Sequence, residues 1–214
     1  MVRGCVSMPK EETLSSLILH GYLRSSRVIE ALRAVPREDF VLPGARKYAW
    51  EDHPLPIGFG QTISAPHMYA IMLEAAQIRE GNQVLEVGAG SGYGAALLSF
   101  LVGKKGRVFS VEIVPELAAF AKDNVRKAGL EAEVIAGDGA SGHGKGAPYD
   151  RILVTAACGK VPPALVAQLK KGGRMLVPAG SLFQELLLIK KTGAGEKVTP
   201  LLPVQFVPLL SPGI

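Results

Sequence analysis

Apolar positions recur along the first third of this chain with the period of short amphipathic helices. One such pattern covers residues 10–21 and a second covers 26–35, where Pro36 ends it. The apolar face of the second consists of Val28, Ile29, Leu32 and Val35. Neither segment carries a group with obvious chemistry, so both are predicted to form a small helical cap laid against a larger core.

From residue 84 onward, apolar runs typical of buried strands alternate with helical patterns. The predicted strands are residues 84–87, 107–112, 131–138, 148–157 and 173–180. The predicted helices cover residues 95–102, 115–128 and 161–171. Residues 185–200 then indicate a strand pair around a glycine turn at 193–195, and the proline-containing tail 203–212 indicates an edge strand or an extended segment.

This alternation predicts an α/β fold, namely a doubly wound, Rossmann-like, mostly parallel sheet with helices on both faces. A small N-terminal helical cap and a C-terminal strand pair complete it. We therefore divide the chain into residues 1–60, a helical cap and loop, and residues 61–214, the sheet domain, and expect one compact unit.

The first predicted strand runs directly into a glycine loop with Gly88, Gly90 and Gly92. A dinucleotide-binding fingerprint would require glycine or alanine at position 93, where this chain has Tyr93. The run Glu86-Val-Gly-Ala-Gly-Ser-Gly instead resembles the first motif of S-adenosylmethionine-dependent methyltransferases. In those enzymes the loop holds the methionine part and the sugar of the cofactor.

Two carboxylates follow at the ends of later strands. Glu112 ends the strand after the glycine loop, where a carboxylate can accept two hydrogen bonds from a ribose diol. We favour that role over a surface glutamate. Asp138 precedes Gly139 and either accepts from an adenine amino group or makes an ordinary Asp-Gly turn.

The stretch from Pro43 to Ser64 is rich in proline and glycine and is expected to contain no regular element. Ser64 precedes a helical pattern with Pro66 in its first turn. It is therefore either the N-cap of that helix or a hydroxyl that binds a carboxylate at a helix N-terminus. His67, in the same turn, is interpreted as a packing or capping residue.

The net charge, the cysteine count and the absence of recognisable targeting signals restrict the expected partners and compartment, but they identify no catalytic group. The formal net charge is +5 with an isoelectric point near 9.2, but the charges are scattered, which favours a solvated surface over a nucleic-acid face. The two cysteines give neither a disulfide framework nor a metal spacing, and no metal is predicted. Since no signal peptide or membrane span is recognised, we expect a cytoplasmic protein with no membrane association.

At family level the chain resembles the protein-L-isoaspartate O-methyltransferases from about residue 25 to the end. The most specific stretch is PLPIGFGQTISAPHM at 54–68, followed in the family's order by VLEVGAGSGYG, SVE, GDG, PYDRILVTAA and GGRMLVPAG. The ending QFVPL at 205–209 has Gln205 where the family usually has a basic residue.

This resemblance implies methyl transfer from S-adenosyl-L-methionine to the free α-carboxylate of L-isoaspartyl residues in damaged peptides and proteins. The methyl ester then collapses through a succinimide that can reopen to aspartate, and S-adenosyl-L-homocysteine is the other product. The resemblance assigns Ser64 as the catalytic residue and residues 61–214 as the methyltransferase domain. It assigns cofactor contacts to Gln61, Thr62, Ile63, Ser64, Gly88, Ala89, Gly90, Ser91, Gly92, Glu112, Asp138 and Gly139.

Two alternative functions follow from the same sequence. The basic isoelectric point fits a class I RNA methyltransferase, although the fourth strand ends in Thr155-Ala-Ala rather than in the Asn/Asp-Pro-Pro-aromatic signature. A non-catalytic adaptor that binds S-adenosylmethionine is the other alternative, against which the retained Ser64, Glu112 and Asp138 argue. The favoured reading expects a monomer that acts on isoaspartyl peptides and binds no nucleic acid.

Overall fold

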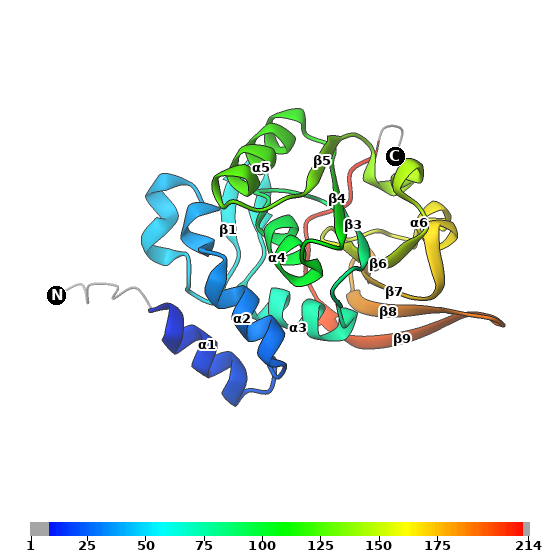
Figure 1. Ribbon diagram of the computed structural model, residues 1–214, viewed down its shortest axis with the longest axis horizontal. Helices are drawn as coiled ribbons and strands as arrows, with labels where there is room; N and C mark the ends of the chain where they lie inside the picture. The colour runs from blue at the N-terminus through cyan, green and yellow to red at the C-terminus, as the bar shows by residue number, and fades with distance from the viewer. Residues whose placement is uncertain (1–8, 212–214) are drawn as a thin grey trace.

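The computed structural model describes residues 9–211, and most of the strands in that range join one sheet. These strands are β3 (Gln83–Val87), β4 (Arg107–Glu112), β5 (Glu133–Ala136), β6 (Tyr149–Val154), β7 (Leu169–Ala179), β8 (Gln184–Thr192) and β9 (Gly195–Val204). Within the described range the sheet has seven strands in the order β5-β4-β3-β6-β7-β8-β9 (Figure 1). Neighbours from β5 to β7 are parallel, and β8 and β9 are antiparallel. The predicted fold class and the C-terminal strand pair are confirmed.

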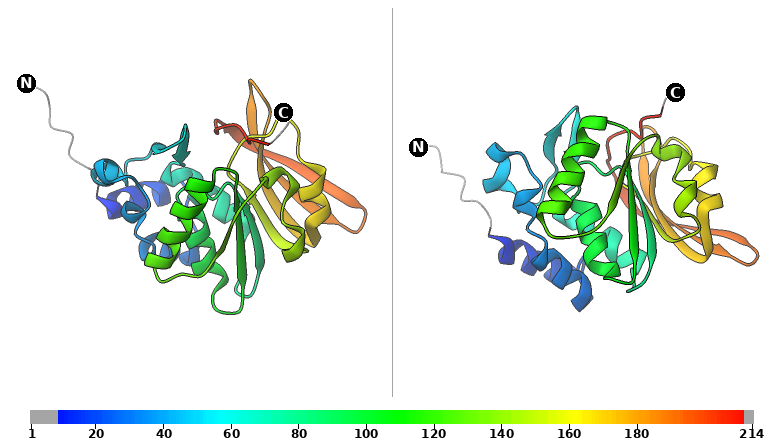
Figure 2. Two further views of the ribbon diagram at one scale, coloured as in Figure 1. Left: turned by 90° about the horizontal axis from the view of Figure 1, so that it is seen from above. Right: turned by 45° about the horizontal axis from the view of Figure 1, so that its top comes forward.

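Helices cover both faces of this sheet, but unevenly. The α-helices are α1 (Lys10–Leu19), α2 (Ser26–Ala34), α3 (Pro66–Ala76), α4 (Tyr93–Val102), α5 (Pro115–Lys127) and α6 (Pro163–Gln168). Short 3₁₀ turns are η1 (Arg37–Asp39), η2 (Pro43–Tyr48), η3 (Gly139–Ser141) and η4 (Gly144–Gly146). Buried residues of α1 to α5 pack in one cluster on one face, whereas α6 packs on the other (Figure 2).

The central strands β3, β4 and β6 are mostly apolar on both faces because both faces are covered. Val84 and Val108 face the cluster with α1 to α5, and their neighbours Leu85 and Phe109 face the cluster with α6. In β3 this alternation leaves Glu86 on the side of α4, where the residue is only 1% exposed. The continuous apolar runs of the sequence therefore reflect burial on two sides.

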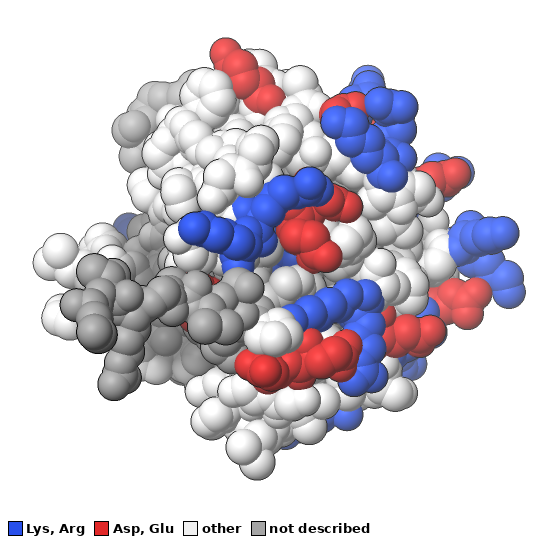
Figure 3. Space-filling model, turned by 90° about the vertical axis from the view of Figure 1, so that its left-hand side faces the viewer, with Lys and Arg blue, Asp and Glu red and all other residues white. Residues whose placement is uncertain are grey.

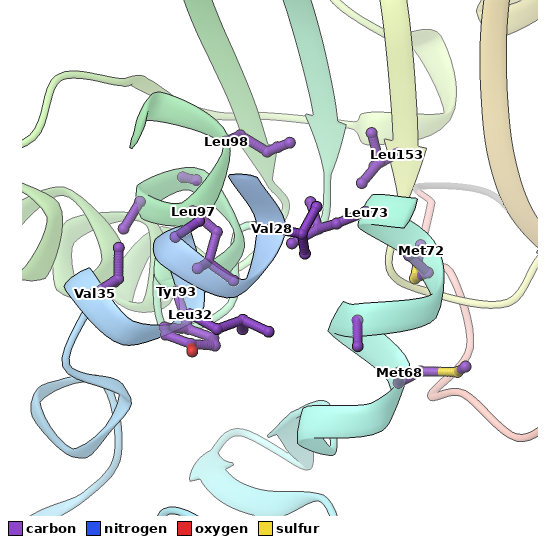
Figure 4. Packing of buried hydrophobic residues seen from close by; sticks show 14 of the residues in the cluster. Val28, Leu32, Val35, Met68, Met72, Leu73, Tyr93, Leu97, Leu98 and Leu153 are labelled. Carbon is purple, nitrogen blue, oxygen red and sulfur yellow. The ribbon is translucent and has the colours of Figure 1, made fainter. Parts of the chain in front are cut away.

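The N-terminal cap shares its core with the sheet. The predicted apolar face of α2 is confirmed, with Val28, Leu32 and Val35 buried and Ile29 partly buried. Figure 4 shows Leu32 beside Tyr93 of α4 and Val28 beside Leu73 of α3, all in one cluster. One hydrophobic cluster thus joins residues on both sides of position 60, and a division of the chain there stays a proposal.

Two local predictions are wrong. Residues 43–64 contain η2 and an antiparallel strand pair, β1 (Leu55–Gly58) and β2 (Gln61–Ile63). Leu55 and Ile57 alternate with exposed residues and are buried, so a two-residue period persists in spite of the prolines. The helix predicted at 161–171 ends at Gln168, because Leu169 already pairs with Tyr149 as the start of β7.

The C-terminal tail leaves the sheet after β9 and crosses the ends of the central strands. The amide of Ala157 donates to Val207 and that of Leu209 donates to the carbonyl of Ala157, at 2.8 and 2.7 Å. Gln184 exchanges two further hydrogen bonds with the backbone of Phe206. The prediction of an edge strand or extended segment is confirmed for residues up to 211. No helix in the described part of the chain is long and apolar enough to span a membrane.

Candidate active site

The strand order reverses on the two sides of β3, since β4 lies on one side and β6 on the other. Ligands of open α/β sheets bind at the carboxyl ends of the strands at such a point. Gly88 follows β3 there with φ 95°, and a Cβ on it would lie 2.4 Å from Oγ1 of Thr155, which follows β6. Glycine is therefore required at position 88 for both conformation and space.

Glu112 fixes the glycine loop to the end of β4. Its Oε2 accepts a hydrogen bond from the Gly90 amide at 2.8 Å, and its Oε1 accepts one from the Val114 amide at 3.0 Å. The residue is only 5% exposed. Each carboxylate oxygen has a second lone pair, so Glu112 can accept two further hydrogen bonds from a diol without giving up either amide.

A small cavity lies between this loop and the C-terminal tail. It is lined by Gln61, Thr62, Val87, Gly88, Gly90, Val111, Glu112, Ile113, Gly139, Thr155, Ala156 and residues 207–210. Its volume is about 50 Å³, well below the roughly 300–1,000 Å³ of typical ligand sites. The tail forms part of its wall, since residues 207–210 line it.

The chemistry of this lining fits S-adenosylmethionine. Glu112 supplies acceptors for a ribose diol, while Ile113 and Leu209 supply apolar surface for a flat base. Of the predicted cofactor contacts, the structure brings together six around this cavity: Gln61, Thr62, Gly88, Gly90, Glu112 and Gly139. It does not place Ile63, Ser64, Ala89, Ser91, Gly92 or Asp138 in its lining.

Asp138 makes local contacts that suit a capping residue. Its Oδ1 accepts from the Ala140 amide at 2.9 Å, and its Oδ2 accepts from the hydroxyls of Ser141 and Ser211, each at 3.0 Å. The carboxylate thus caps the short turn η3 and ties the tail to it. An adenine contact by Asp138 stays a proposal.

Ser64 lies in a second, larger cavity of about 790 Å³. Its lining comprises Pro54, Thr62, Ser64, Ala65, His67, Met68, Thr155 and residues 202–207. Thr62, Thr155 and Val207 line both cavities. The two cavities therefore adjoin, with the glycine loop on one side of the junction and Ser64 on the other.

The N-cap interpretation of Ser64 is wrong. Helix α3 begins at Pro66, and its N-cap residue is Ala65. The methyl side chain of Ala65 cannot accept a hydrogen bond from the first turn of the helix. The first free amide of the helix, that of His67, instead donates to Oδ1 of Asp52 at 2.9 Å. Because Asp52 caps the helix from a distance, the Ser64 hydroxyl has no capping task.

Sequence patterns gave no indication of Asp52 and little indication of the tail. Asp52 accepts both the backbone amide and the Nδ1–H of His67, each at 2.9 Å. Partial burial would raise the pKa of the Asp52 carboxyl, but these hydrogen bonds outweigh it and hold that pKa below its usual range. Only the fold brings positions 52 and 202–210 to this edge.

A second carboxyl beside the site belongs to the core. Burial raises the pKa of Glu86 to about 8. The negative charge of Glu112 raises this pKa further, whereas a hydrogen bond from Ser110 lowers it in part. The Ser110 hydroxyl donates to its Oε2 at 2.5 Å. Glu86 lines neither cavity. Among residues 9–211 no three His, Cys, Asp or Glu side chains gather in a way that could hold a metal ion.

Comparison with known proteins places this arrangement among carboxyl methyltransferases. A family model described as protein-L-isoaspartate(D-aspartate) O-methyltransferase matches residues 8–212. The chain is 50% identical over 204 residues to the protein-L-isoaspartate O-methyltransferase of Ignicoccus hospitalis, covering 94% of this chain and 97% of that protein. Identity to the protein of the same name from Methanopyrus kandleri is 54% over 188 residues, covering 86% and 82%.

Solved structures agree. One, described as protein-L-isoaspartate O-methyltransferase, superposes with a TM-score of 0.85 at 34% identity, covering 95% of this chain and 66% of that one. Another, from Plasmodium falciparum and described as such an enzyme in complex with S-adenosyl-L-homocysteine, gives 0.83 at 25% identity and covers 95% and 99%.

Proposed function

The chain belongs to the protein-L-isoaspartate(D-aspartate) O-methyltransferase family, and from this premise we propose its reaction and the residues that perform it. It transfers a methyl group from S-adenosyl-L-methionine to the free α-carboxylate of L-isoaspartyl residues in damaged peptides and proteins. The observation that carries the proposal is the pair of adjoining cavities, one beside Glu112 and the other beside Ser64. A cofactor in the first and a peptide in the second meet at Thr62 and Thr155.

The chain's own residues divide the work between the two cavities. Glu112 accepts the ribose hydroxyls, and the loop Gly88–Gly92 carries the sugar and the methionine part, in keeping with its place at the switch in strand order. Gly139 and Asp138 approach the adenine. On the other side, the Ser64 hydroxyl donates to the substrate carboxylate and holds one of its oxygens at the junction.

Methyl transfer to a carboxylate requires mainly that the protein align the two reacting groups. S-adenosylmethionine, when bound, supplies a methyl group on a positively charged sulfonium. An ionised carboxylate is already a nucleophile, so the protein must align it and remove water from around it. The tail serves the second need, because residues 202–207 line the larger cavity and residues 207–210 line the smaller one. The resulting methyl ester collapses through a succinimide, which reopens in part to aspartate and so begins repair.

The RNA methyltransferase alternative finds less support. On the face shown in Figure 3, basic and acidic side chains are interleaved rather than gathered into one basic surface. Ion pairs such as Arg33–Glu11 and Arg126–Asp123 neutralise part of the positive charge. The strand end at Thr155 also lacks the residues that an amino-group methyltransferase uses. We propose that the protein works as a monomer in the cytoplasm and without nucleic acid; the isolated cysteines fit a reducing compartment.

A pH profile of the chemical step tests this assignment. The proposed nucleophile is an α-carboxylate with a reference pKa of about 3.5, so it loses no proton before attack. The single-turnover rate at saturating peptide and cofactor should be nearly flat from about pH 6 to 9. Single turnover is needed because product release can mask the chemical step. A tenfold rise between pH 6 and 8 would indicate a general base and contradict carboxylate attack.

A further inference from the structure

The ring of His67 is held in one orientation at the wall of the larger cavity. Oδ1 of Asp52 accepts its Nδ1–H at 2.9 Å and also accepts its backbone amide. The ring of Tyr22 lies on it with the centroids 6.0 Å apart and the planes tilted by 43°. A single carboxylate oxygen that binds both the backbone and the ring leaves the imidazole little freedom to rotate.

This arrangement also decides which nitrogen is free. A carboxylate can only accept, so the proton on a neutral His67 ring lies on Nδ1, and Nε2 carries a lone pair. No hydrogen bond joins Nε2 to another residue in the range 9–211. The side chain is 36% exposed and forms part of the cavity lining together with Ser64. On a neutral ring this lone pair is available to a molecule in that cavity.

The rest of the lining offers a peptide few comparable partners. Among the described lining residues none is Lys, Arg, Asp or Glu, and most are apolar. Besides His67, the polar side chains of the lining are the hydroxyls of Thr62, Ser64 and Thr155 and the amide of Gln205. A peptide that enters this cavity loses water from its main-chain N–H groups, and each such group then needs an acceptor.

We infer that Nε2 of His67 accepts a main-chain N–H of the isoaspartyl substrate next to the damaged residue, which makes the Asp52–His67 pair a substrate-positioning device. The inference rests on the proposed function, since it assigns a contact to the same peptide. His67 exchanges no proton with the reacting atoms. It aligns the peptide so that the free carboxylate reaches Ser64.

The test is a binding cycle between His67 and the substrate backbone. Two isoaspartyl peptides are compared with their parent: in one, an ester oxygen replaces the N–H of the isoaspartyl residue, and in the other it replaces the N–H of the following residue. Binding is measured by calorimetry to the protein saturated with S-adenosyl-L-homocysteine, so that no turnover occurs. Each peptide is tested on the parent protein and on His67→Phe, His67→Gln and His143→Phe.

One ester should bind the parent protein on the order of tenfold more weakly than the amide. His67→Phe should bind the amide peptide about tenfold more weakly and should lose the difference between amide and ester. His67→Gln, whose terminal amide oxygen can accept in place of Nε2, should restore much of the affinity. His143→Phe lies outside both cavities, keeps a ring against Phe109 and should behave as the parent.

Three results would overturn the inference. They are equal binding of amide and esters by the parent protein, an unchanged ester effect in His67→Phe, and unchanged amide binding in His67→Phe. The comparison of amide and ester binding by the parent protein needs no variant, so it remains a valid test even if a substitution unfolds the chain. An unchanged ester effect with weaker overall binding would instead indicate a protonated ring that meets the carboxylate. If the parent protein neither binds nor methylates the peptide, the proposed function itself fails.

Discussion

Replacement of Glu112 by alanine should weaken the binding of S-adenosylmethionine at least thirtyfold. The variant loses two proposed hydrogen bonds from the ribose diol to a carboxylate, a loss of about 2–4 kcal/mol. It also frees the amides of Gly90 and Val114, which the carboxylate holds at 2.8 and 3.0 Å. Calorimetry with S-adenosyl-L-homocysteine measures the effect without turnover.

Glu116→Ala is the matched control for this prediction. Glu116 is an exposed glutamate in the first turn of α5, four residues after Glu112, and its replacement changes the net charge by the same amount. It should bind the cofactor as the parent does. If Glu112→Ala and Glu116→Ala bind equally well, Glu112 does not hold the ribose.

Ser64→Ala should slow methyl transfer roughly ten- to a hundredfold at saturating substrate. A hydrogen bond to a charged group contributes about 1.5–3 kcal/mol, and here the proposed charge is the reacting carboxylate. Cofactor affinity and thermal stability should stay close to those of the parent, because Ser64 is not the cap of α3. Ser64→Thr, which keeps a hydroxyl, should retain more activity than the alanine variant.

Asp52→Ala supplies the contrast in stability. It removes the actual cap of α3 and should lower the free energy of unfolding by about 1 kcal/mol. Since the folded pKa of Asp52 is lowered, its contribution is complete above the unfolded pKa of about 4 and is lost as the pH falls through the folded value. Thermal unfolding of Asp52→Ala and of the parent protein at pH 7 therefore measures the full contribution of Asp52. A Ser64→Ala protein as unstable as Asp52→Ala, but fully active, would contradict the role of Ser64.

The sheet could be predicted because its information is local. Residues 107–112 form β4 as expected, and the run that ends at Val87 enters the glycine loop as expected. The central strands β3, β4 and β6 are mostly apolar, and each is followed by a helix with its own period. The pair β1 and β2 was missed because Pro54, Pro56, Gly58 and Gly60 obscure a short alternation of buried residues.

The site could be predicted only in part, because much of it depends on distant segments. The glycine loop and Glu112 follow directly from strand ends, and both line the smaller cavity. The cap of α3 could not be predicted in this way, since Asp52 lies 15 residues before the His67 amide that donates to it. The same holds for residues 202–210, which reach the site only because β9 pairs with β8 and returns the chain to the carboxyl edge.

The central claim is that adjoining cavities beside Glu112 and Ser64 bring a methyl donor to an isoaspartyl carboxylate. The most direct test incubates the protein with radiolabelled S-adenosylmethionine and three acceptors: an isoaspartyl peptide, the same peptide with normal aspartate, and tRNA. Base-labile label is expected in the isoaspartyl peptide, with only background in the other two. Label in tRNA, or equal label in both peptides, would contradict it.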